Sequence, residues 1–450
     1  MANPEKPASV EPVKATPTDE QRAIATTEDR QTRRATSEAE LAVAPEIVAD
    51  NFRDYVHAWV SRVRGGESGV LPVVIGFIAI SILFQAQNSK FLSSGNLTNL
   101  LVQSAVFMLL GMAEVFALLL GEIDLSIGFV SGIGGIVAAE LVVPARGWPW
   151  WAAIAVALLT TAAIGTLHGT IITRLRLPSF VVTLAGLLGW QGVMLLMLGK
   201  GGTVPIPDKV INDLANGNLT PTAGWLAAVL IVGMFALVTW FRDARRRASG
   251  LVAPPVSLTV LKIAAVAASA AALLFVCNTN RGALVPIRGV PWVVLIVLGV
   301  LVAWTLLLGR TKFGRYMYAI GGNPEAARRA GVNLALIRTT AFALSGFTAG
   351  IAGIIYASRL RSVSTSLDGG TLVLYSVAAA VIGGTSLFGG RGKALHAVLG
   401  GLVIAAIYNG MGLLGMSAAS QYMITALVLL AAVTVDAVAR RGRVAGTTSR

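Results

Sequence analysis

The sequence predicts an all-α protein that crosses a membrane about twelve times. Of its 450 residues, 55% are hydrophobic and only 13% are charged, whereas a soluble domain carries about a quarter charged residues. Apolar runs of about 18–22 residues recur between Leu71 and Val438, and each is long enough to cross a hydrocarbon layer of about 30 Å as a helix. These observations predict a polytopic integral membrane protein.

The expected spans are separated by shorter polar or glycine-rich segments. They are residues 70–87, 101–120, 127–143, 152–173, 180–198, 224–241, 259–277, 291–308, 339–357, 372–384, 394–414 and 420–438. Because twelve is an even number, we expect the two termini on the same side of the membrane.

The Lys and Arg residues of the loops predict the orientation of the chain. With residues 1–69 left out, alternate loops place 19 basic residues on one side of the membrane and 8 on the other. Cytoplasmic loops are enriched in Lys and Arg, so both termini are expected in the cytoplasm. The net charge of +14 is explained by these loops, and nucleic-acid binding is not expected.

The segment before the first span, residues 1–69, is expected to be a largely disordered cytoplasmic segment. Residues 1–50 contain no aromatic residue and few large apolar ones, and such a composition cannot offset the entropy of ordering. The first apolar run begins near Leu71, too late for a signal peptide. Residues 51–64 place Phe52, Tyr55 and Trp59 on one helical face, which predicts either an interfacial helix or an extension of the first span. Residues 440–450 are expected to form a cytoplasmic tail.

A short helix is expected in the loop between the eighth and ninth spans. Asn323 is suited to cap it, Pro324 to open it, and Glu325 to lie at the positive end of its dipole. Gly331 is suited to end it. Such a rigid cytoplasmic element could dock in a groove of a partner, although an ordinary interfacial helix would have the same sequence features.

This loop resembles the EAA loop of bacterial ABC importer permeases. The resemblance lies in Glu325-Ala326-Ala327 followed, after three residues, by Gly331, within the segment FGRYMYAIGGNPEAARRAGVN. Three further stretches are similar to ribose- and xylose-type permeases: GEIDLSIG at 121–128, LPSFVVTLAG at 177–186 and VIGGTSLFGGRG at 381–392. Residues 70–439 are thereby identified as a permease domain. One departure is Leu372–Ser376, where relatives carry an acidic pair.

The resemblance implies the rest of an importer. A cytoplasmic ATPase subunit, a periplasmic sugar-binding protein and a second permease copy are the implied partners, in a bacterial inner membrane. The extra pair of spans over 224–277 is similar to the xylose branch, which implies D-xylose as the substrate, with ribose or another small sugar as alternatives. The residues implied to contact the ATPase are Asn323, Pro324, Glu325, Ala326, Ala327, Arg328, Arg329 and Gly331.

Two glycine-interrupted segments, 121–128 and 383–392, are candidates for the translocation path, because irregular backbone at membrane depth often lines a substrate route. Both are expected at its cytoplasmic end, unless they are ordinary turns in which Asp124 and Ser126 cap the next span. Gln103, Gln421, Trp190, Tyr375 and Tyr408 are weaker candidates, since each also suits ordinary packing. The path candidates are Glu114, Glu122, Asp124, Ser126, Thr385, Ser386 and Asn409.

The sequence argues against enzymatic and ion-coupled functions. It contains no G-x-x-x-x-G-K-[ST] loop, so ATP is expected to be hydrolysed by the partner, with no cofactor or metal bound by this chain. An ion-coupled transporter needs buried ionisable relays, and the spans offer only Glu114 and Asp436. The three His residues are far apart in sequence, so no enzyme site is expected.

Overall fold

The computed structural model describes residues 71–251, 253–282 and 285–446. The expected disordered segment, the expected interfacial helix over 51–64 and residues 447–450 of the expected tail lie outside the described residues.

Helices occupy every position at which the sequence predicts a span. They are α3 (Leu71–Gln87), α4 (Ser94–Leu119), α5 (Ile127–Val142), α6 (Trp150–Leu175), α7 (Ser179–Leu198), α9 (Pro221–Ala248), α10 (Val256–Asn278), α11 (Trp292–Arg310), α14 (Leu334–Leu360), α15 (Gly369–Ile382), α16 (Ala394–Leu413) and α17 (Ala418–Gly446). Of the helices that the structure describes, eight are long and apolar enough to cross a membrane. The apolar helices α3, α5, α15 and the first part of α17 are shorter.

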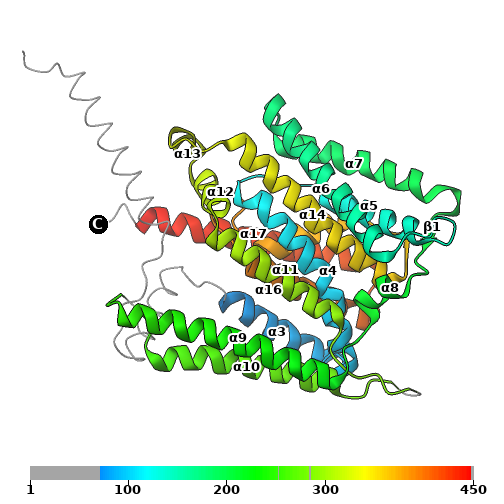
Figure 1. Ribbon diagram of the computed structural model, residues 1–450, viewed down its shortest axis with the longest axis horizontal. Coiled ribbons are helices and arrows are strands. Elements are labelled where there is room, and N and C mark those ends of the chain that lie inside the picture. The colour runs from blue at the N-terminus through cyan, green and yellow to red at the C-terminus, as the bar shows by residue number, and fades with distance from the viewer. Residues whose placement is uncertain (1–70, 252, 283–284, 447–450) are drawn as a thin grey trace, which may run out of the picture.

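Short elements connect these helices at the two ends of the bundle. At one end lie α12 (Lys312–Gly322) and α13 (Pro324–Arg329), and at the other lie η1 (Gly199–Gly201), β1 (Thr203–Pro205), α8 (Lys209–Asn216) and β2 (Ser362–Ser364) (Figure 1). The strands β1 and β2 pair antiparallel, with Thr203 opposite Ser364. The start of α3 and the end of α17 lie toward the end that carries α13 (Figure 1).

The core is formed by α4, α5, α14 and α16, and small residues let these helices approach closely. A Cβ atom on Gly353 of α14 would lie 1.7 Å from the carbonyl oxygen of Ser131 on α5. Close backbone contact of this kind replaces the hydrophobic drive that is missing between helices in lipid. In α4, 89% of the most apolar stretch is buried, against 11% in α9 and in α10. The helices α9 and α10 therefore form a peripheral hairpin, side by side at one edge of the bundle (Figure 1).

Candidate functional site

The helix α13 has the capped geometry that the sequence predicts. Asn323 adopts an extended backbone conformation, and its Oδ1 accepts a hydrogen bond from the backbone N–H of Ala326 at 3.0 Å. Pro324 opens α13, where its missing N–H removes no helical bond. Gly331 has a φ of +82°, a left-handed conformation that suits glycine, and the chain turns there toward α14. The helix itself is short, with 6 residues.

The charges of α13 are organised around Glu325. Its Oε1 lies 2.8 Å from Nη2 of Arg328 and 3.2 Å from Nε of Arg329. Hydrogen bonds from these guanidinium groups lower the pKa of Glu325 to about 2, so the carboxylate is ionised at neutral pH. The side chains of Arg328 and Arg329 are 67% and 79% exposed, so α13 presents a positive surface.

The helix α12 packs against the end of α4 and against the glycine-interrupted segment 383–392. A Cβ atom on Gly321 would lie 1.8 Å from the carbonyl oxygen of Leu119 at the end of α4 and 2.4 Å from the backbone nitrogen of Gly390. The hydroxyl of Tyr318 donates a hydrogen bond to the carbonyl of Gly392 at 2.7 Å. The helix α12 therefore contacts both the end of α4 and the segment that follows α15.

A buried polar cluster surrounds the segment between α4 and α5. Oδ1 of Asp124 accepts a hydrogen bond from the hydroxyl of Ser126 at 2.6 Å, and Oδ2 accepts one from Ser345 of α14 at 3.2 Å. Oε1 of Glu114 accepts the backbone N–H of Asp124 at 3.2 Å. Asp124 therefore joins the N-cap residue of α5, Ser126, to α14, and Ser126 itself makes no side-chain capping bond.

The cluster continues through His168 and Trp190, whose contact was not predicted from the sequence. The indole N–H of Trp190 donates to Nε2 of His168 at 3.0 Å. An indole nitrogen is a donor only, so Nε2 accepts and the proton of a neutral His168 resides on Nδ1. Nδ1 lies 3.1 Å from the hydroxyl oxygen of Ser126. The hydrogen bonds therefore run in one direction, from Trp190 through His168 and Ser126 to Asp124.

An ion pair links the same segment to the start of α14. Oε1 of Glu122 lies 2.9 Å from Nε of Arg338, and the two side chains are 11% and 29% exposed. Burial raises the pKa of Glu122, whereas the positive charge of Arg338 opposes that rise. Both residues line a cavity of about 670 Å³ between the α6–α7 connection and α14, a short distance along the chain from α13.

The remaining path candidates, Thr385, Ser386 and Asn409, lie outside the polar cluster around Asp124. Thr385 is buried, and its hydroxyl has no hydrogen-bond partner among the described residues. The backbone N–H of Ser386 bonds to the carbonyl of Arg391, which closes the segment between α15 and α16. Asn409 lies toward the opposite end of the bundle, where its Nδ2 donates to Oε1 of Gln103 at 3.4 Å and its Oδ1 accepts from Asn96 at 2.8 Å.

Two carboxylates outside the expected spans are also buried. The sequence offered Glu114 and Asp436, yet Asp124 is 1% exposed and Asp243 is fully buried. Asp243 is held by the hydroxyl of Thr259 at 2.9 Å and by Nε of Arg242 at 3.0 Å. Both carboxylates lie near helix ends in the sequence, and only the packing of neighbouring helices removes them from solvent.

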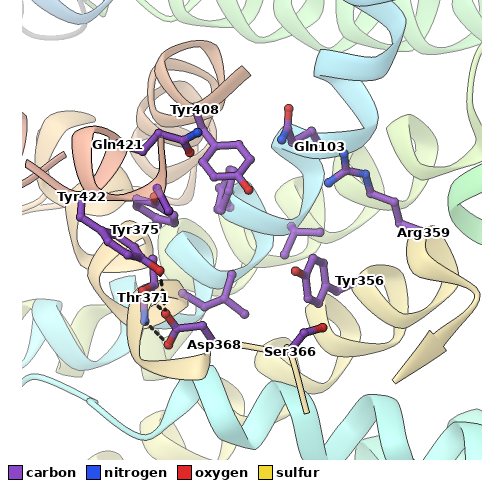
Figure 2. Close-up of a pocket in the computed structure, with 14 residues that line it drawn as sticks. Gln103, Tyr356, Arg359, Ser366, Asp368, Thr371, Tyr375, Tyr408, Gln421 and Tyr422 are labelled. Atoms are coloured by element: carbon purple, nitrogen blue, oxygen red, sulfur yellow. Dashed lines mark hydrogen bonds between the residues drawn. The ribbon is translucent and has the colours of Figure 1, made fainter. Parts of the chain in front are cut away.

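A second polar cavity lies where α14 ends and α15 begins (Figure 2). Its volume is about 230 Å³, and α4, α14, α15, α16 and α17 supply its walls. Gln103, Gln421, Tyr375 and Tyr408, which the sequence marked as weaker candidates, line it together with Arg359 and Asp368, which it did not mark. Arg359 follows the expected span 339–357, and Asp368 precedes the expected span 372–384. Charged residues are common at such positions, so neither residue stood out as a candidate for a binding site.

The chain matches known proteins over most of its length. Residues 96–433 match the family described as the permease component of the branched-chain amino acid transport system. The chain belongs to this family of permease components. The permease is 35% identical over 385 residues to the xylose transport system permease protein XylH of Escherichia coli K12. The aligned region covers 84% of this chain and 95% of that protein.

Two other relatives are named for the transport of other sugars. The permease is 30% identical to the ribose import permease protein RbsC of Escherichia coli K12, over 85% of this chain and 96% of that protein. It is 28% identical to the D-allose transport system permease protein AlsC of the same organism, over 80% of this chain and 88% of that protein. No solved structure matches the permease.

Proposed function

We propose that this permease is the membrane-spanning subunit of an ATP-driven importer that carries a monosaccharide, D-xylose, into the cytoplasm. The similarity to XylH supports the substrate, and the similarity to RbsC keeps ribose as the alternative. The observation that carries the mechanism is the capped, exposed α13, which is joined through α12 to the end of α4, just before the 121–128 segment, and to the 383–392 segment.

The assembly has several parts beyond this chain. A separate cytoplasmic ATPase hydrolyses ATP, because this sequence has no phosphate-binding loop, and the permease itself binds no cofactor or metal. A periplasmic sugar-binding protein delivers the sugar, and two permease copies form the channel in the bacterial inner membrane. Each copy crosses the membrane twelve times, with both termini in the cytoplasm.

The coupling mechanism follows from the contacts of α12 and α13. The positive surface of α13 docks in a groove of the ATPase, and movement of the ATPase displaces α12. Because α12 touches the ends of α4 and the Gly390–Gly392 backbone, this displacement reaches both segments. Glu122, Asp124, Ser126, Thr385 and Ser386 then form the cytoplasmic end of the sugar route, with Glu114 behind them.

Uptake into proteoliposomes tests the proposal. The permease is reconstituted with its ATPase and its periplasmic binding protein, and uptake of radiolabelled D-xylose is measured with ATP and no ion gradient. ATP-dependent uptake is expected, with D-xylose outcompeting D-ribose and D-allose. Uptake that needs a proton or sodium gradient and proceeds without ATP would refute the proposal in favour of an ion-coupled transporter.

A further inference from the structure

The cavity of about 230 Å³ lies within a single copy of the permease, and none of the residues of α12 or α13 lines it. Pockets for drug-sized ligands have volumes of about 300–1,000 Å³, so this cavity suits a smaller molecule. Its lining combines flat aromatic rings with side chains that form hydrogen bonds. A small, polar ligand with an apolar face fits this combination.

Three aromatic rings form one wall of the cavity. Phe107 and Tyr375 pack edge to face with ring centroids 5.2 Å apart, and Tyr408 lies 6.0 Å from each of them. Mutual packing of this kind fixes the orientation of the rings. A pyranose sugar has C–H groups on its ring faces and hydroxyl groups around its edge, so its face can stack on such a wall while its edge remains free for hydrogen bonds.

The polar side chains of the cavity have hydrogen-bonding capacity to spare. Among the described residues, Arg359 forms no ion pair and no hydrogen bond through its guanidinium group. It lies on the same side as Gln103, whose Oε1 is occupied by Asn409 and whose amide N–H groups remain (Figure 2). These two side chains offer donors to a ligand.

Acceptors lie on the other side of the cavity (Figure 2). Oδ1 of Asp368 accepts the backbone N–H of Thr371 at 3.1 Å, and Oδ2 accepts the hydroxyls of Thr371 and Tyr422. Nε2 of Gln421 donates to the carbonyl of Met416 at 2.9 Å, which leaves its Oε1 free to accept. One cation and one anion line the cavity, so neither an anionic nor a cationic ligand is favoured, and a neutral polyol can use both sides.

We propose that this cavity is a subsite for a neutral monosaccharide in its pyranose form. The sugar ring stacks on Tyr375 and Tyr408, and its hydroxyls bond to Arg359 and Gln103 on one side and to Asp368 and Gln421 on the other. The inference rests on the proposed function and adds to it a resting place for the sugar inside each copy, at the end away from the ATPase. The wall formed by α17 packs mainly against α15, so it can yield when sugar enters.

Thiol protection tests the subsite in the complete complex of permease, ATPase and binding protein. The buried Cys277 is the only cysteine, so Cys277→Ala gives a background without thiols. In this background Tyr422→Cys places a thiol at an exposed lining position, and Thr365→Cys places a matched thiol on an exposed position outside the cavity. Labelling by a small hydrophilic thiol reagent is followed with D-xylose and with sucrose, a disaccharide too large for the cavity.

D-Xylose at about nine times its dissociation constant should slow labelling of the Tyr422→Cys variant about tenfold. Sucrose should not slow it, and the Thr365→Cys variant should be labelled at one rate throughout. Adding Arg359→Gln should remove most of the protection, whereas Arg361→Gln, an exposed arginine outside the cavity, should leave it intact.

The two proposals fail in different ways. Equal labelling with and without D-xylose, in complexes that still import D-xylose with ATP, would overturn the subsite and leave the proposed function standing. Absence of ATP-dependent import by the unmodified complex would instead overturn the proposed function. Protection that survives Arg359→Gln unchanged would also overturn the subsite, because it would place the bound sugar elsewhere.

Discussion

At the scale of single residues, Asn323 and Asp124 hold the two candidate regions in place. Asn323 closes the first turn of α13 with one hydrogen bond, and Asp124 joins α5 to α14 with several. The first contact is exposed and local, whereas the second is buried and joins residues that are 221 positions apart. Substitution should therefore affect docking in the first case and stability in the second.

Asn323→Ala should weaken docking of the ATPase without unfolding the permease. Loss of an N-cap costs about 1 kcal/mol, which corresponds to about a fivefold loss of affinity if α13 must be helical to dock. The measurement is binding of the purified ATPase to the permease in nanodiscs, together with the thermal unfolding temperature. Asn333→Ala is the matched control, because Asn333 caps α14 in the same way at 3.0 Å. Equal affinities for the wild-type and the Asn323→Ala proteins would contradict a docking role for α13.

Asp124→Ala should lower both stability and uptake. The substitution leaves the buried hydroxyls of Ser126 and Ser345 without their acceptor, and each such loss costs about 1–3 kcal/mol. Thermal unfolding in detergent and uptake per folded molecule are measured side by side. Asp243→Ala is the control, since Asp243 is equally buried but lies in the peripheral α9–α10 hairpin, so it should lower stability and leave uptake per folded molecule unchanged. Normal expression and uptake of the Asp124→Ala protein would remove Asp124 from the sugar route.

At the scale of elements, the contact between α12 and the end of α4 depends on the absence of a side chain. Gly321 approaches the carbonyl of Leu119 so closely that a methyl group cannot fit without a shift of α12, whereas Gly322, the next residue, has open space around it. Both glycines lie in α12, so alanine changes helix propensity similarly at the two positions but creates a steric clash only at Gly321.

Gly321→Ala should uncouple ATP hydrolysis from uptake. The added methyl group pushes α12 away from α4 at a cost of about 1–3 kcal/mol, so movement at α13 no longer reaches the two glycine-interrupted segments. Uptake and ATPase activity stimulated by the binding protein are measured in the same proteoliposomes. We expect a strong loss of uptake per ATP hydrolysed, and no such loss for Gly322→Ala. Identical ratios for the two variants would show that α12 does not transmit movement.

At the scale of the whole molecule, the arrangement separates two polar regions. The cluster around Asp124 lies near the end that carries α13, and the cavity lined by Arg359 and Asp368 lies toward the other end. A route that begins at the periplasmic side and ends at the cytoplasmic side would pass the cavity first and the cluster second. This order depends on the orientation of the chain.

Labelling from the two sides of the membrane tests that orientation. In the Cys277→Ala background, Arg329→Cys should react with an impermeant thiol reagent only from the cytoplasmic side, because basic loops remain there. Thr365→Cys should react only from the periplasmic side. Both positions are exposed, so each serves as the accessibility control for the other. Reaction of the Arg329→Cys variant from the periplasm would invert the orientation and end the role proposed for α13.

The sequence alone determined the positions of the helices and the start of α13. Apolar runs of membrane-spanning length and an Asn-Pro-Glu cap are local signals, so they predicted the twelve apolar helices and the hydrogen bond of Asn323, but not α8, α12, β1 or β2. The number of spans, their orientation and the contact with an ATPase remain predictions.

Only the tertiary structure decided which polar groups meet. Asp124 contacts Ser345, His168 receives a hydrogen bond from Trp190, and Arg359 faces a cavity shared with Asp368. These residues lie on or beside different helices, and a hydrophobic pattern shows which segments span the membrane but not which faces are turned toward each other. Close approach of small residues between helices sets those faces, and this depends on the whole bundle.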